Sequence, residues 1–83
     1  MSFQLQMANE KKELKRILDF LTQKHIKVKD VQTTYHEKGP VAFIYVPSSK
    51  FPFNRRGILK LSKLEKEIYQ KLAPKIKVIL IAS

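Results

Sequence analysis

Apolar side chains recur at helical spacing over residues 9–24. Leu14, Ile17 and Leu21 follow the i, i+3, i+7 pattern of a helix that buries one face. Asn9 is a suitable N-cap, and acidic residues follow it in the expected first turn, where the helix dipole favours negative charge. The opposite face carries a basic cluster, Lys11, Lys12, Lys15 and Arg16. We therefore expect a first helix whose basic face is either solvated or turned toward phosphate.

A second helix is predicted over residues 63–73. Ser62 and Glu65 have the spacing of a capping box at its start. The apolar stripe of this helix consists of Leu61, Leu64, Ile68 and Leu72. Pro74 ends the helix, because the residue before a proline is pushed out of the helical region.

The remaining apolar segments have the patterns of strands. Residues 26–35 alternate in polarity, and the alternation shifts by one residue at Asp30, which predicts a β-bulge. Residues 41–46 are apolar on both faces and are expected to lie at the centre of a sheet. The Gly39-Pro40 pair between these two segments predicts an antiparallel hairpin. Residues 76–82 are expected to form a buried strand, joined in parallel by a right-handed crossover.

The start of the chain decides between two topologies. Residues 2–7 alternate with a period of two, which fits either a short edge strand or a terminal tail. With that strand, the order β-α-β-β-α-β is ferredoxin-like; without it, α-β-β-α-β is the order of the type II KH-like group. Both place two helices on one face of a small mixed sheet of three or four strands. We expect a single α+β domain over residues 1–83.

Three stretches resemble the pattern of the BolA family: ELKRILDFLTQKHIKVKDVQ, AFIYVPSSKF and YQKLAPKIKV. Ser48 and Phe51 match the family's S-x-x-F element, whereas Asn54-Arg55-Arg56 comes earlier than the family's Arg-His-Arg signature and lacks its histidine. The hairpin segment KVKDVQTTYHEKGPVAFIYV is also similar to that of ribosome-binding factor A. Both resemblances imply the type II KH-like fold group and nothing finer.

Charge is the strongest global signal. Seventeen Lys and Arg against seven Asp and Glu give a net charge of +10, which favours a polyanionic partner. We expect nucleic acid, RNA rather than DNA; the alternatives are an acidic protein partner docked by a BolA-like interaction module, and a purely solubilising role. An interaction module would have an exposed strand for edge pairing, either residues 2–7 or residues 26–35.

The candidate site is the segment 47–60, which contains Pro, Gly, Phe and Arg between two apolar strands and is expected to be a long loop. Its cations are suited to phosphate, its aromatic rings to stacking on unpaired bases, and Gly57 to close approach of a ligand. The predicted nucleic-acid-binding residues are Lys50, Phe53, Asn54, Arg55, Arg56, Lys60 and Lys63. The alternative for Phe51 and Phe53 is that both anchor the loop in the core.

Other chemistry has little support in the sequence. The chain has no cysteine, and its two histidines, His25 and His36, lack the spacing of a metal site. No nucleophile motif or glycine-rich phosphate loop is present. We therefore expect no enzyme activity, no cofactor, no membrane association and a cytoplasmic location.

Overall fold

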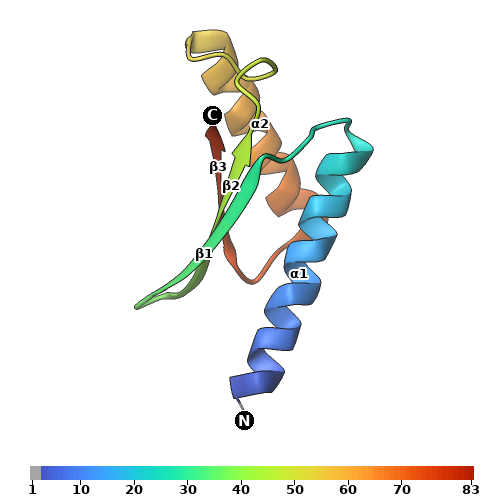
Figure 1. The fold of residues 1–83 in the computed structure, drawn as a ribbon, viewed down its shortest axis with the longest axis vertical. Helices are drawn as coiled ribbons and strands as arrows, with labels where there is room; N and C mark the ends of the chain where they lie inside the picture. Colours follow the sequence, from blue (N-terminus) through green and yellow to red (C-terminus); the bar gives the residue numbers. More distant parts are fainter. Residues whose placement is uncertain (1–2) are drawn as a thin grey trace.

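The computed structural model describes residues 3–83, and the side chains of residues 10–83. It has two helices and a three-stranded mixed sheet, an α+β fold. The elements in chain order are α1 (Phe3–Gln23), β1 (Asp30–His36), β2 (Gly39–Val46), α2 (Arg55–Leu72) and β3 (Lys77–Ala82). Figure 1 shows the sheet beside both helices, with α1 and α2 running in opposite directions. Among the described residues, no helix is both long and apolar enough to cross a membrane.

The sheet has the order β1-β2-β3, so the predicted central strand is central. β1 and β2 form an antiparallel hairpin in which His36 pairs with Gly39, and the left-handed φ of Gly39, 121°, suits glycine at the turn. β2 and β3 are parallel neighbours connected through α2, as the crossover rule predicts.

The core lies between the helices and one face of the sheet. Ala42, Ile44 and Val46 of β2 are fully buried, whereas Phe43 and Tyr45 between them are half-buried. The side chains that close the core from the other elements are Ile17, Leu21, Leu64, Ile68, Val78 and Leu80. Both helices therefore cover the same face, since alternate residues of a strand point to opposite sides.

The strand considered for residues 2–7 is wrong over its described part, because α1 already begins at Phe3. Phe3 and Met7 also fit a helical spacing that leads into Leu14 and Leu21, and no Gly or Pro separates them from it. The helical period continues through Asn9, which is therefore not the N-cap. Ser2 lies outside the described residues.

The predicted bulge at Asp30 is also wrong. The pairing of β1 with β2 runs without interruption from Asp30 opposite Tyr45 to His36 opposite Gly39. The shift in polarity instead marks the point where the connection from α1 ends and the strand begins. Ile26 is buried in the core and Val28 packs against it, so their alternation reflects the packing of a connecting segment.

The second helix is longer than predicted. α2 begins at Arg55 with Asn54 as its N-cap, so residues 55–60 of the expected loop are helical and the connection shrinks to residues 47–54. The capping box at Ser62 and Glu65 is wrong, because both residues lie inside the helix. The prolines and the glycine of residues 47–60 suggested a loop. Asn54, a residue type that is preferred at N-caps, was the signal in the sequence for a helix that starts at Arg55.

Both helices end with a residue in the left-handed conformation. His25 has φ 61°, and Ile26 N–H donates to the Leu21 carbonyl at 3.0 Å, which completes a Schellman motif. Ala73, with φ 43°, ends α2 directly before Pro74, as the sequence predicts.

Candidate nucleic-acid interface

The start of α2 gathers most of the predicted binding residues. Arg55, Arg56, Lys60 and Lys63 are exposed on its first two and a half turns, and Phe53 precedes them with 76% of its surface exposed. We call these five residues the α2 basic surface. Arg56, Lys60 and Lys63 lie three or four residues apart and therefore share one face of the helix, whereas Arg55 lies about 100° around the helix axis from Arg56.

The two phenylalanines of the connection have different roles. Phe51 is buried at 6% exposure and belongs to the core, as one of the two alternatives states. Phe53 projects into solvent, with 76% of its surface exposed. Phe51 therefore anchors the connection in the core, while Phe53 is exposed to solvent.

Asn54 and Gly57 fix the start of α2. The side-chain oxygen of Asn54 accepts a hydrogen bond from Gly57 N–H at 2.9 Å. A Cβ on Gly57 would lie 1.7 Å from the carbonyl oxygen of Pro52, so only glycine fits there. The close approach that we expected for a ligand is used instead by the protein's own backbone, and it fixes the angle at which α2 begins.

Lys50 stands apart from the α2 basic surface. Its ammonium group donates a hydrogen bond to the carbonyl oxygen of His25, at the C-terminal end of α1. A cation at that end complements the helix dipole. Lys50 therefore joins the connection to α1.

The charges at the start of α2 oppose its dipole. The first turn contains no acidic residue, while Arg55 and Arg56 occupy the first two helical positions after Asn54. Positive side chains are unfavourable at the positive end of a helix, where negative groups normally lie. A bound anion would remove this conflict, because helix N-termini and arginines both favour phosphate.

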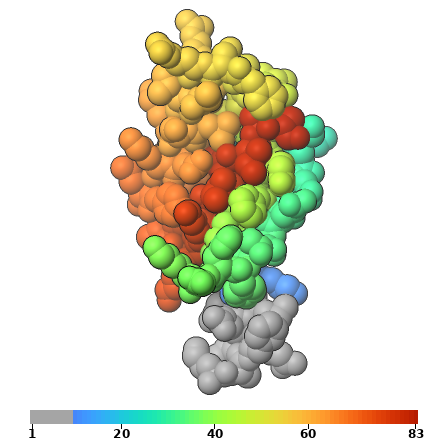
Figure 2. Space-filling model, turned by 90° about the vertical axis from the view of Figure 1, so that its left-hand side faces the viewer, coloured from blue at the N-terminus to red at the C-terminus, as the bar shows by residue number. Residues whose placement is uncertain are grey.

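The sequence prediction missed the sheet face opposite the helices, which we call the open sheet face. Figure 2 shows β1, β2 and β3 side by side on this face, with no described helix over them. Its side chains are Asp30, Gln32, Thr34, His36, Val41, Phe43, Tyr45, Lys77, Ile79 and Ile81. The sequence did contain a signal for this face. Residues 41–46 are apolar on both faces of the strand, and two helices on one side of the sheet leave its other side uncovered.

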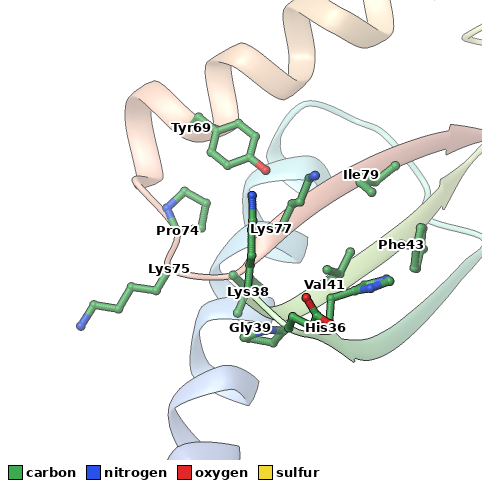
Figure 3. A pocket seen from close by; sticks show the side chains of 13 residues that line it. His36, Lys38, Gly39, Val41, Phe43, Tyr69, Pro74, Lys75, Lys77 and Ile79 are labelled. Carbon is green, nitrogen blue, oxygen red and sulfur yellow. The ribbon is translucent and has the colours of Figure 1, made fainter.

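A shallow depression lies at the hairpin end of the open sheet face (Figure 3). Val41, Phe43 and Ile79 form its apolar part, and its cationic lining consists of Lys38, Lys75 and Lys77. Tyr69 borders it from α2: its hydroxyl accepts from Val78 N–H at 2.7 Å and donates to the Val78 carbonyl at 3.1 Å. This pair of bonds satisfies the outer edge of β3 at that point and fixes α2 against the strand.

Two carboxylates, Glu67 and Glu10, make contacts that involve the helix layer. Glu67 contacts Lys24 across the helix pair, and that hydrogen bond, reinforced by the charges of Lys24 and Lys71, lowers the pKa of Glu67. Glu10 accepts a hydrogen bond from the Tyr35 hydroxyl, which raises the pKa of Tyr35. Both carboxylates are thereby occupied with contacts between elements.

The two histidines are separated by β1. His25 closes α1, and His36 ends β1 at the hairpin. Among the described side chains, no three of the His, Cys, Asp or Glu type lie close enough to hold a metal ion.

Comparison with known proteins adds no relative. No family model, no curated protein and no solved structure matches this chain. The resemblance to the BolA family and to ribosome-binding factor A therefore remains a prediction.

Proposed function

We propose that this protein is a binding module for nucleic acid, RNA rather than DNA, without catalytic activity of its own. The observation that carries the proposal is the pair Arg55 and Arg56 at the positive end of the α2 dipole, with no acid in the first turn. An arrangement that costs helix stability without a ligand is explained when a phosphate binds there.

The rest of the α2 basic surface extends this anion site. Lys60 and Lys63 continue the positive charge along the exposed side of the helix, so successive phosphates find successive cations. Phe53 adds an exposed ring next to the arginines, suited to stacking on an unpaired base. Cations together with a free aromatic ring favour a single strand over a duplex, whose bases are already stacked.

A second candidate, docking of an acidic protein partner, is favoured by β1. This strand lies at the edge of the sheet, and six of its seven residues are exposed, so its outer backbone groups face solvent. An extended segment of a partner would pair with that edge. The other edge that we considered, residues 2–7, is helical from Phe3 onward and does not serve this purpose.

The test of the primary proposal is the double substitution Arg55→Ala with Arg56→Ala, measured by fluorescence anisotropy on a labelled single-stranded RNA. Loss of two phosphate or base contacts is expected to weaken binding by about 1–3 kcal/mol, or roughly 5- to 150-fold. Circular dichroism establishes that the fold is kept.

The matched control is Lys11→Ala with Lys15→Ala, which removes the same charge from exposed positions of α1. Its affinity is expected to fall by much less than that of the arginine variant. Equal losses for the two variants would reduce the α2 basic surface to bulk charge, and a folded arginine variant with unchanged affinity would refute its role.

A further inference from the structure

The open sheet face carries an aromatic pair on its central strand. Phe43 and Tyr45 are two residues apart on β2, which places them about 7 Å from each other along the strand. Both are half-buried, so their rings are held by neighbours while part of each ring remains accessible. Ile79 lies opposite Phe43 and Ile81 opposite Tyr45 on β3, and these residues extend the apolar surface sideways.

Cations stand at both ends of this pair. At the hairpin end, Lys38, Lys75 and Lys77 line the depression beside Phe43 (Figure 3). At the other end, the backbone N–H of Lys29 donates to the Tyr45 carbonyl at 2.8 Å. The Lys29 ammonium donates to the Ser83 carbonyl at 3.3 Å, so this cation lies at the C-terminal end of β3. Lys27 lines the same end of the sheet as Lys29.

Two acidic residues lie among these cations. Glu37 is in the hairpin turn, and Asp30 pairs with Tyr45 across the hairpin. The Asp30 carboxylate accepts from Val31 N–H at 2.8 Å, so part of its hydrogen-bonding capacity is used locally. The five lysines outnumber the two acids, and the border of the aromatic pair is net positive.

The open sheet face is continuous with the α2 basic surface. A second depression runs around the edge of β3, and it joins Ile81 of the sheet to Ile58 and Phe53 at the start of α2. Glu65 is the acidic residue in its lining. Figure 2 shows β3 in red directly beside the yellow and orange segments of α2 and its entry.

We infer that the open sheet face is a stacking platform for a single strand of nucleic acid, with Phe43 and Tyr45 each holding one base. This inference rests on the proposed function and assigns it a second, larger contact surface. The lysines at the two ends bind the phosphates that flank the stacked bases, and the strand continues past Ile81 to Phe53 and the arginines. The positive charge around the aromatic pair favours nucleic acid as the ligand of this face. A second copy of the chain would instead bring like charges together.

The test substitutes Phe43→Leu with Tyr45→Leu, which removes both rings and keeps the face apolar. Binding of a labelled single-stranded RNA is expected to weaken at least fivefold, while the weaker binding of the matching duplex stays unchanged, since only unpaired bases stack. Phe20→Leu is the control, because it removes a half-buried ring from the helix layer. Circular dichroism and thermal melting compare the folds of all three proteins.

The possible results distinguish failure of the proposed function from failure of the stacking platform. If the wild-type protein binds no nucleic acid, the proposed function itself fails. If it binds and the platform variant binds equally well, the proposed function stands and the platform is refuted. A wild-type dimer that Phe43→Leu with Tyr45→Leu converts to a monomer, seen by light scattering, would show that a second copy covers the face and would also overturn the inference.

Discussion

Two residues, Gly57 and Asn54, decide where α2 begins and hence where the arginines lie. The Asn54 side chain satisfies the N–H of Gly57, and Gly57 itself packs against the Pro52 carbonyl without room for a side chain. No other residue fits at position 57, because even the methyl group of alanine would overlap the backbone of Pro52. The positions of Arg55 and Arg56 are therefore set by their neighbours and not by contacts of their own.

Gly57→Ala tests this account of the helix start. The added methyl group forces Pro52 and the connection to move, and we expect a loss of about 1–3 kcal/mol in the free energy of unfolding, measured by urea denaturation. The neighbouring exposed position provides the comparison, since Ile58→Ala is expected to change stability by about 0.5 kcal/mol or less. A fully stable Gly57→Ala protein would contradict the observed packing of the connection.

A polar contact between Tyr35 and Glu10 joins the hairpin of β1 and β2 to α1. The Tyr35 hydroxyl lies 2.6 and 2.5 Å from the two carboxylate oxygens of Glu10. This hydrogen bond, with smaller contributions from burial and from the charge of Glu10, raises the pKa of Tyr35 above its ordinary 10.0. Glu10 thus acts as a tertiary contact in the interior of α1, and not as the first-turn acid that the sequence suggested.

The sign of this shift predicts a dependence on pH. A raised pKa means that the fold favours the neutral phenol, so the contact is present in full below the ordinary pKa of tyrosine and is lost as pH rises through the raised value. Titration of the assigned Tyr35 ring signals by NMR measures the shift. Glu10→Gln is expected to lower the pKa of Tyr35 toward its ordinary value, and an unchanged titration in that variant would show that the contact does not form in solution.

At the scale of elements, the sequence predicted the class and the central parts of the fold. Buried stripes with strong periodicity identified α1, α2, β2 and β3, because burial dictates the pattern there. The errors are at boundaries: the start of α1, the start of β1 and the start of α2. At each boundary a short sequence pattern was misleading. The alternation at residues 2–7 lies within the longer helix α1 from Phe3 onward, and the Ser62–Glu65 spacing lies inside α2. The alternation before Asp30 belongs to a packed connection.

At the scale of the molecule, the sequence indicated only part of the candidate site. The sequence identified the cations and Phe53, but it placed Arg55, Arg56 and Lys60 in a loop and left their common surface on α2 undescribed. The open sheet face was missed because an apolar strand is usually covered on both sides. Only the arrangement of the layers shows that Phe43 and Tyr45 are accessible on a face that the helices leave open.

The charge of +10 is spread over both layers of the fold. Ten of the cations lie on α1 and α2, and the remainder lie on the connections, the hairpin and the edge of the sheet. A spread of this kind alone would bind any polyanion weakly. We propose a narrower mode of binding, in which specific cations of α2, next to the exposed ring of Phe53, hold the phosphates of a single strand.

The dependence of RNA affinity on salt concentration tests this claim most directly. Anisotropy titrations of the wild-type protein against single-stranded RNA, its duplex and the matching DNA at several salt concentrations give Kd and its log–log slope. We predict micromolar or tighter binding to the single-stranded RNA at physiological salt, with a slope of about −3 or steeper if the four α2 cations each neutralise one phosphate. No binding to any of the three, or equal affinity for the duplex and the single strand, would contradict the account.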